Sequence, residues 1–195
     1  MHGLINSAIQ SFVCHTYGRD RWVKMAQRSE LGFVDYEAML VYDDDQSRAV
    51  LKVICEDLAR PEADVLEDLG TFLVSHPEIT SVRRLLRFSG TTFVDFINSL
   101  DDLPDRVRLA VSDLILPPLE LRELTTGLFS LKCGPGLAGY GRVMVGILRA
   151  MADEYGALVM LDHTGTPGKH EEISIALIET AFAEGRNFEL GAGAK

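Results

Sequence analysis

Apolar residues recur at helical spacing through the first half of the chain. Between residues 3 and 17 they form one stripe that ends at Gly18, and glycine can adopt the left-handed conformation that closes a helix. The same spacing predicts further helices, which cover about 44–59, 63–76, 82–88 and 92–100. A largely helical first part therefore follows from the pattern alone.

Two stretches within this part are less regular. A short helix is predicted from Asp20, which can cap it, and the mixed stretch 30–42 is predicted to be a loop with one short helix. Pro61 and Pro77 separate neighbouring helices, because proline lacks the amide hydrogen and restricts the residue before it. Helices are expected to fill residues 1–112.

After Pro117-Pro118 the period changes to that of a strand. Leu119, Leu121 and Leu124 are interspersed with charged residues, and Thr126-Gly127 is typical of a hairpin turn before a second strand. A glycine-rich connection then leads to a helix that ends near Gly156. Further strands are predicted at 157–161 and 173–178.

The order of these elements predicts an α+β fold. A helical N-terminal part, 1–112, is expected to pack on a small antiparallel sheet with one long helix, formed by 113–195. A chain of 195 residues with 47% hydrophobic content can bury one core without needing a second. We therefore expect a single domain over 1–195.

Charge and cysteine content narrow the class of partner. Nineteen basic residues against 29 acidic ones give a net charge of -10, which repels nucleic acid and anionic membrane surfaces. Cys14, Cys55 and Cys133 have no metal-binding spacing, and their odd number favours reduced thiols. His15 and Arg19 interrupt the first apolar stretch, so neither a signal peptide nor a membrane span is expected there. We expect a cytoplasmic protein.

The usual enzyme motifs are missing from the sequence. There is no GxSxG elbow, HExxH pair, P-loop or strand-linked GxGxxG. The acidic pairs Asp101-Asp102 and Glu171-Glu172 are expected to be solvated or to cap helices. Asp162-His163 has no partner at a spacing that would indicate catalysis or metal binding. No catalytic residue, no metal site and no enzymatic activity are predicted.

Three runs of residues resemble one known family. The opening Met1-His2-Gly3-Leu4-Ile5 is followed by Phe12-Val13 and Tyr17-Gly18, and the run 85–103 reads LLRFSGTTFVDFINSLDDL. Pro117 with Leu119, and the run VMVGIL at 143–148, complete the match. Together they resemble the H-NOX (haem nitric oxide/oxygen binding) family, over nearly the whole chain. The resemblance implies a bacterial sensor domain with a haem pocket.

The resemblance places Pro104 where the family carries the histidine that binds haem iron. A proline nitrogen is an acylated amide without a basic lone pair, so it cannot ligate iron in any protonation state. With Asp102 as cap and Asp105 in the first turn, Pro104 suits the start of a helix instead.

The family's Tyr-x-Ser-x-Arg motif, which binds the haem propionates, is also missing. Aligned on Gly146, its three positions fall on Cys133, Pro135 and Leu137. Aligned on Gly136-Leu137, they fall on Ser130, Lys132 and Gly134. Neither alignment supplies the tyrosine or the arginine, so the resemblance makes haem the family's cofactor while two of its anchors are absent.

The resemblance further implies which residues line the pocket, namely Ile5, Ile9, Leu73, His76, Leu103, Pro104, Pro117, Cys133 and Ile147. One hypothesis is a haem-free signalling module, whose pocket is filled by side chains or takes another small apolar ligand. The alternative is a haem-binding gas sensor that uses a substitute axial ligand, for which His76 is best placed. Either would regulate a bacterial signalling protein, such as a histidine kinase, a cyclase or a cyclic-dinucleotide enzyme.

Overall fold

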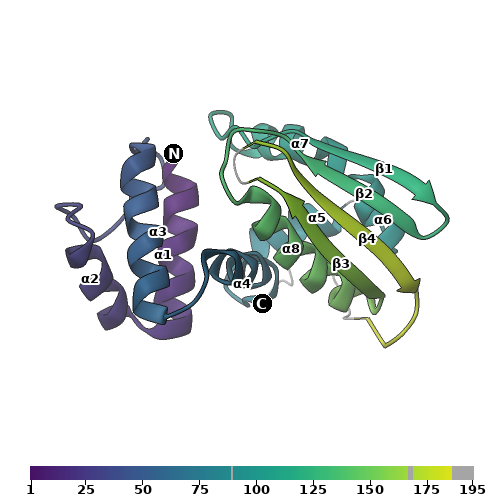
Figure 1. Cartoon of the computed structure of the whole chain (residues 1–195), viewed down its shortest axis with the longest axis horizontal. Coiled ribbons are helices and arrows are strands. Elements are labelled where there is room, and N and C mark those ends of the chain that lie inside the picture. Colours follow the sequence, from purple (N-terminus) through teal and green to yellow (C-terminus); the bar gives the residue numbers. More distant parts are fainter. Residues whose placement is uncertain (89, 167–168, 186–195) are drawn as a thin grey trace, which may run out of the picture. The chain divides into compact units, whose positions relative to one another are not determined.

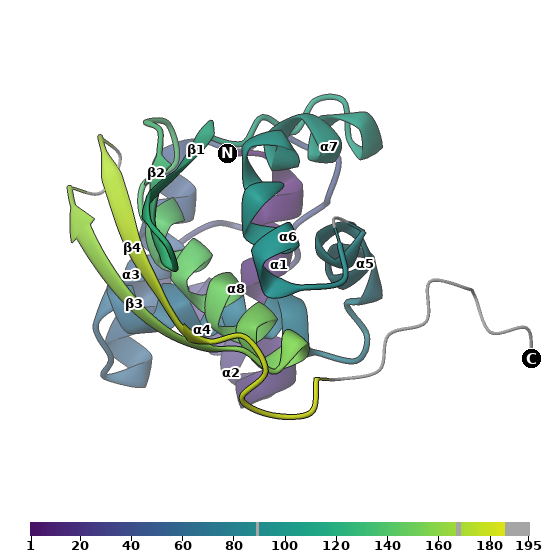
Figure 2. The same ribbon diagram turned by 90° about the vertical axis from the view of Figure 1, so that its right-hand side faces the viewer.

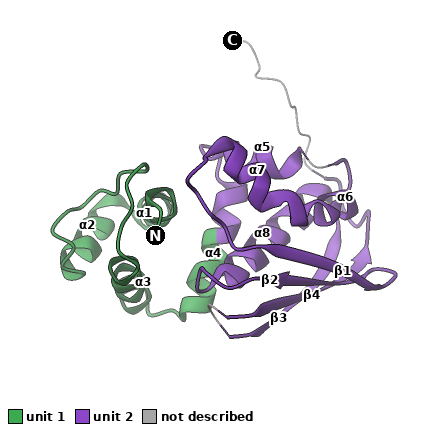
Figure 3. Ribbon diagram, turned by 90° about the horizontal axis from the view of Figure 1, so that it is seen from above, with its two compact units in different colours: residues 1–69 green, residues 70–195 purple. Residues whose placement is uncertain are grey.

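The protein is described by a computed structural model over residues 1–88, 90–166 and 169–185. It forms two compact units, residues 1–69 and 70–195 (Figure 3). The boundary between them falls inside the helix α4 (Glu62–Ser75), well before the predicted change from helices to strands. A single domain over 1–195 stays a prediction. Ser89, in the run that resembles the H-NOX family, lies outside the described residues.

Unit 1 is built from α1 (Gly3–Tyr17), α2 (Arg19–Arg28), α3 (Asp44–Leu58) and the start of α4 (Figure 1). These helices confirm the prediction made from the spacing of apolar residues, and Trp22 and Ile54 are fully buried. Asp20 does not cap α2, because the helix already begins at Arg19 after Gly18. Asp20 lies in the first turn instead, where its negative charge still suits the positive end of the helix dipole.

The short helix expected within 30–42 is not formed. This stretch consists of turns and extended backbone, because other elements compete for its hydrogen bonds. Trp22 Nε1 donates to the Val34 carbonyl at 2.8 Å, and the Tyr36 amide donates to Gln10 Oε1 at 2.9 Å. These bonds from α1 and α2 satisfy groups that a helix would have paired locally.

Unit 2 begins with short helices, α5 (Thr80–Arg87), α6 (Phe93–Asn98), the 3-10 turn η1 (Leu100–Asp102) and α7 (Leu103–Ala110). Thr92 caps α6 by accepting a hydrogen bond from the Asp95 amide, and the Asp95 side chain accepts one from the Thr92 amide at 3.0 Å. This capping box satisfies amides that a helix start leaves unpaired.

A four-stranded antiparallel sheet completes unit 2. Its strands are β1 (Leu119–Thr125), β2 (Leu128–Cys133), β3 (Leu158–Gly165) and β4 (Glu171–Glu179), in the order β1-β2-β4-β3. Gly127 turns the first hairpin with a positive φ of 78°. The mixture of helices with this sheet confirms the predicted α+β fold.

Helix α8 (Tyr140–Tyr155) covers one face of the sheet (Figure 2). It starts at Tyr140, within the glycine-rich stretch predicted to be a connection, and it buries residues on most of its surface in one continuous core with β2 and β4. On the side of α8 away from the sheet, Gly70 of α4 lies so close that a Cβ there would collide with the Val143 carbonyl oxygen. Among the described residues, no helix combines the length and apolar character needed to span a membrane.

We predict that Gly70→Ala lowers the free energy of unfolding by about 1–3 kcal/mol, since backbone rather than a flexible side chain occupies the space. Urea unfolding followed by circular dichroism measures the change. The exposed substitution Ser81→Ala in α5 is the control and is expected to stay within about 0.5 kcal/mol of the parent. Equal stability of Gly70→Ala and the parent would contradict this contact.

Candidate functional site

Pro104 is the second residue of α7, as expected for a proline that starts a helix. Asp102 stands at the cap position but makes no side-chain capping bond, so that prediction is wrong. The reason is that η1 runs directly into α7 and gives Asp102 a helical rather than an extended backbone. Its neighbour Asp101 accepts a 2.6 Å hydrogen bond from the Leu121 amide and so joins η1 to β1.

Arg106, which lies on α7, ties this helix to two neighbouring segments. Its guanidinium donates to the Ser99 carbonyl at 3.0 Å, to Ser99 Oγ at 3.2 Å and to the Leu85 carbonyl at 3.4 Å. Partial burial lowers the pKa of Arg106 from its ordinary value. This role of Arg106 could not be predicted from the sequence, because an arginine on a short helix is usually solvated.

Position 104 cannot supply a ligand to iron. The half-buried Pro104 ring presents only carbon atoms beyond its acylated nitrogen. Leu103 before it is buried in the core of unit 2, and Asp105 after it is exposed. Pro104, which the resemblance aligns with the family's iron-binding histidine, therefore does not fit haem as an iron ligand.

Cys133, Pro135 and Leu137 do not form a propionate site either. Cys133 is buried, and burial, reinforced by the negative charge of Glu171, raises the pKa of its thiol to about 12. Pro135 is exposed, and Leu137 packs against the core. None of the three offers a charged donor to a carboxylate.

The other alignment places the motif on residues that already have roles in the sheet. Ser130 Oγ donates to the Glu172 carboxylate, and the Gly134 amide donates to the Pro118 carbonyl at 2.8 Å. Lys132 is exposed, and Glu120 and Glu172 are its cross-strand neighbours. Two carboxylates beside this lysine disfavour a third from a ligand.

A buried polar cluster lies at the end of the sheet beside Cys133. His163 Nε2 donates to Glu171 Oε2 at 2.9 Å, and each side chain is only 4% exposed. A Cβ on Gly141, in the first turn of α8, would lie 2.6 Å from both of these atoms. The expectation that Glu171 is solvated or caps a helix is thus wrong for its side chain, because pairing with His163 offsets the cost of burying its charge.

Tyr140 completes this cluster and was missed by the sequence reasoning. Its hydroxyl is buried and has no hydrogen-bond partner among the described residues. Burial, with a smaller contribution from Cys133, raises the pKa of Tyr140 well above its ordinary value. The antiparallel pairing of β3 with β4 could have indicated the His163–Glu171 contact, but nothing in the sequence indicates the buried hydroxyl.

A cavity of about 390 Å³ opens next to this cluster. It is lined by Lys132, Cys133, Thr164, Gly165, His170, Glu171 and Glu172. Among the described residues, its lining carries one lysine and two carboxylates, one of which is already paired with His163, and it contains no arginine that could bind a propionate.

The structure brings only some of the predicted pocket residues together. Leu103, Cys133 and Ile147 belong to one continuous core of unit 2. Pro117 is buried and lies 3.9 Å from where a Cβ on Gly136 would be, and Leu73 is half-buried on α4. Ile5 and Ile9 lie on α1 in unit 1. That these residues line one pocket stays a prediction.

His76 follows the last residue of α4 rather than lying on the helix. The Glu78 amide approaches His76 Nδ1 at 3.4 Å, and the imidazole ring lies 4.7 Å from the Phe72 ring, centre to centre. In this geometry Nδ1 accepts, so Nε2 carries the proton in the neutral ring. Ligation of iron through Nε2 would require the other tautomer.

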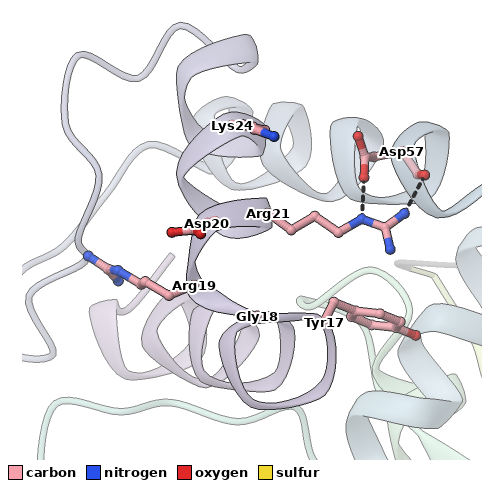
Figure 4. Close-up of a pocket in the computed structure, with 7 residues that line it drawn as sticks. All are labelled: Tyr17, Gly18, Arg19, Asp20, Arg21, Lys24 and Asp57. Atoms are coloured by element: carbon pink, nitrogen blue, oxygen red, sulfur yellow. Dashed lines mark hydrogen bonds and ion pairs between the residues drawn. The ribbon is translucent and has the colours of Figure 1, made fainter.

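A second cavity, of about 610 Å³, lies on unit 1 around the start of α2 (Figure 4). Arg21 points across it, and its Nε donates to Asp57 Oδ2 at 2.7 Å (Figure 4). Arg19 is likewise paired with Asp35, and this ion pair raises the pKa of Arg19. These arginines are therefore already paired with carboxylates, and they anchor α2 instead of forming a site for an anion.

Comparison with known proteins shows which family this chain is similar to. The family model described as haem-NO-binding matches residues 2–163. Soluble guanylate cyclase gcy-35 of Caenorhabditis elegans is 30% identical over 105 residues, which are 53% of this chain and 15% of that protein. Soluble guanylate cyclase 89Db of Drosophila melanogaster is 18% identical over 160 residues, 82% of this chain and 24% of that one. The chain thus spans a quarter or less of these relatives.

Solved structures share the fold at low sequence identity. The Fe(II) unliganded H-NOX protein from K. algicida superposes with a TM-score of 0.79 at 16% identity, covering 94% of this chain and all of that one. An H-NOX protein from S. oneidensis in the Fe(II)NO state gives 0.73 at 17% identity, covering 91% and 99%.

The raised pKa of Cys133 predicts slow alkylation. At pH 8 a thiol with a pKa of about 12 is ionised in roughly one molecule in ten thousand, and burial adds a barrier to access. Iodoacetamide followed by peptide mass spectrometry should leave Cys133 unmodified in the native protein and modify it in guanidinium chloride. Equal rates in the two conditions would show that Cys133 is not buried in solution.

Proposed function

Because the chain belongs to the haem-NO-binding (H-NOX) family, we propose that it is a haem-free sensor domain that regulates a signalling protein. H-NOX domains are sensor rather than catalytic domains, they typically bind haem, and they are coupled to signalling partners such as cyclases. The observation that carries the proposal is Pro104, the second residue of α7, which the resemblance aligns with the family's iron-binding histidine.

The contacts of α7 support this proposal. A bond from iron to a histidine would hold this helix in a haem-binding relative. Here the guanidinium of Arg106 ties α7 to Ser99 and Leu85, and Asp101 ties the preceding turn to Leu121. The helix is therefore positioned by the protein's own polar contacts.

The second anchor region also favours a haem-free domain. Haem propionates are held by charge-assisted hydrogen bonds, which need donors from a guanidinium or hydroxyls. At this end of the sheet the structure instead has the carboxylates of Glu171 and Glu172, a buried neutral thiol and one buried hydroxyl. No arginine lies among the described residues that line this end of the sheet to pair with a propionate.

The residues carried over from the family point to an apolar ligand, if one is bound. Leu73, Leu103 and Ile147, which all belong to unit 2, are aliphatic. Such side chains favour a small apolar molecule over a charged one. The regulated partner would be a bacterial histidine kinase, cyclase or cyclic-dinucleotide enzyme, and the domain itself would have no catalytic activity.

We predict that protein produced with ample haem supply shows no stoichiometric Soret band. The reason is that neither Pro104 nor the segment from Cys133 to Leu137 offers the groups that hold haem. Visible absorption of the purified protein, with a pyridine haemochrome assay for total haem, measures the occupancy. A one-to-one haem complex would overturn the proposal.

If the purified protein does contain haem, His76 is the first candidate for the substitute axial ligand. In that event His76→Ala should abolish the iron–histidine stretching band, since no other predicted pocket residue is a histidine. An unchanged spectrum would remove His76 from consideration.

We further predict that Pro104→His combined with Cys133→Tyr, Pro135→Ser and Leu137→Arg creates haem binding. Each restored charge-assisted bond should contribute about 1.5–3 kcal/mol. Against this, Cys133 and Leu137 pack in or against the core, so larger side chains there cost about 1–3 kcal/mol. Titration with hemin should give a saturable Soret shift that the parent lacks.

The matched control carries the same three sheet and loop substitutions with Pro104→Ala. It should bind hemin at least tenfold more weakly than the histidine variant, because only the iron ligand differs. Circular dichroism establishes that both variants are folded. If the histidine variant is folded but does not bind hemin, the prediction that these four substitutions create haem binding is wrong.

A further inference from the structure

The face of the sheet opposite α8 is open. Along every strand, alternate side chains point into the core, and their neighbours point to this outer face. Glu120, Arg122, Lys132, Asp162 and Glu172 all lie on it and are exposed. An antiparallel sheet with one solvated face is common, so these charges alone would need no partner.

One end of this face is apolar. Cross-strand pairing places Leu128 beside Ala176 and Ala176 beside Met160, which is 66% exposed. Leu124, at the register shift in β1, and Ile178, which is skipped at the register shift between β3 and β4, are also exposed at this end of the sheet. Several large apolar side chains gathered on one exposed surface are characteristic of an interaction site.

The remaining rows carry charge in an ordered way. Reading across β1, β2, β4 and β3, one row is Arg122, Ser130, Ser174, Asp162, and the next is Glu120, Lys132, Glu172, Thr164. The first row has a cation at one edge strand and an anion at the other. In the second row the lysine and a glutamate occupy the two central strands.

We propose that this face binds the same face of a second copy of the chain, about a two-fold axis parallel to the strands. Such an axis reverses the strand order, so β1 lies over β3 and β2 lies over β4 of the second copy. Arg122 then lies over Asp162, Lys132 over Glu172, and Leu128 over Ala176. In these rows no charged residue meets one of like sign.

The alternative two-fold axis, perpendicular to the strands, is disfavoured by the same rows. It lays each strand over its own copy, so that when it passes through the Arg122 row, Arg122 meets Arg122 and Asp162 meets Asp162. The charged row of Lys132 then lies over the apolar row of Leu128 and buries unpaired charge. Charge complementarity thus favours the first axis over a perpendicular axis through the Arg122 row.

The geometry of sheet packing agrees with this arrangement. Two sheets pack face to face about 10 Å apart with strands within about 30° of each other, a distance that lysine and glutamate side chains can bridge. The central strands diverge least, so the Lys132–Glu172 and Leu128–Ala176 pairings are the best preserved. In the free chain, Arg122 pairs with Glu120, and both are exposed enough to reorient.

The oligomeric state of the full chain tests the proposal. Sedimentation velocity over a range of concentrations should show reversible association from 21.5 kDa to twice that mass, weakening as salt is raised. Met160→Lys should weaken dimerisation at least tenfold. The control Ile115→Lys removes an apolar residue that is 82% exposed and lies outside the sheet, and it should leave the association unchanged.

Charge reversal tests the axis itself. Lys132→Glu places two glutamates against each other in a homodimer, and Glu172→Lys does the same with two lysines, so each variant alone should be monomeric. Mixed in equal amounts, the two variants should form a heterodimer, because every facing pair is again of opposite sign. Circular dichroism checks that both are folded, since Glu172→Lys also removes the Ser130 contact.

Three results would overturn the proposal. If the parent chain stays monomeric at every concentration, this face does not bind a second copy of the chain. A dimer unaffected by Met160→Lys must use a different surface. Monomeric single variants that fail to associate when mixed would exclude this two-fold arrangement.

Discussion

The burial of α8 is the constraint on which unit 2 depends. This helix packs against β3 and β4 on one side, while α6 and the end of α4 approach its other sides. Its sequence is accordingly apolar or small over most of its surface, and the exceptions are accommodated individually. Glu154 is buried beside Arg83 of α5, for example, and the two side chains form an ion pair. Removing α8 would leave both the sheet and the short helices without a core.

The position of α8 in the chain also determines the sheet. It connects β2 to β3, and the strand order places β4 between them. Two hairpins, β1–β2 and β3–β4, are thereby joined through their second strands. The outer face, which α8 does not cover, then has its pattern of charges determined by register rather than by the core.

Much of this architecture could be predicted because hydrophobic spacing reports directly on burial. The stripe of α1, the hairpin at Gly127 and the strands that flank α8 all follow from one-dimensional patterns. Contacts made by polar groups across the chain could not be predicted in this way. The stretch 30–42 loses its expected helix to bonds from Trp22 and Gln10, and neither residue is near it in sequence.

The candidate site likewise has one part that could be predicted from the sequence and one part that could not. That Pro104 cannot ligate iron is evident from its chemistry, whatever its surroundings. The nature of the propionate region was not evident, because it depends on where Glu171 and Tyr140 point once the strands pair. Sequence reasoning took Glu171 for a solvated or capping residue, and the fold instead buries it against His163.

The close approach of Gly141 to this pair has a mechanical consequence. The first turn of α8 lies against His163 and Glu171 with no side chain between them, so the helix cannot move toward the sheet without displacing this pair. A shift of α8 toward the sheet is blocked by atoms already in contact. A shift away would admit water to a charge that is now shielded, at a cost that grows with displacement. This end of α8 therefore acts as a fixed pivot, and any ligand-driven motion of the helix would be largest at Tyr155.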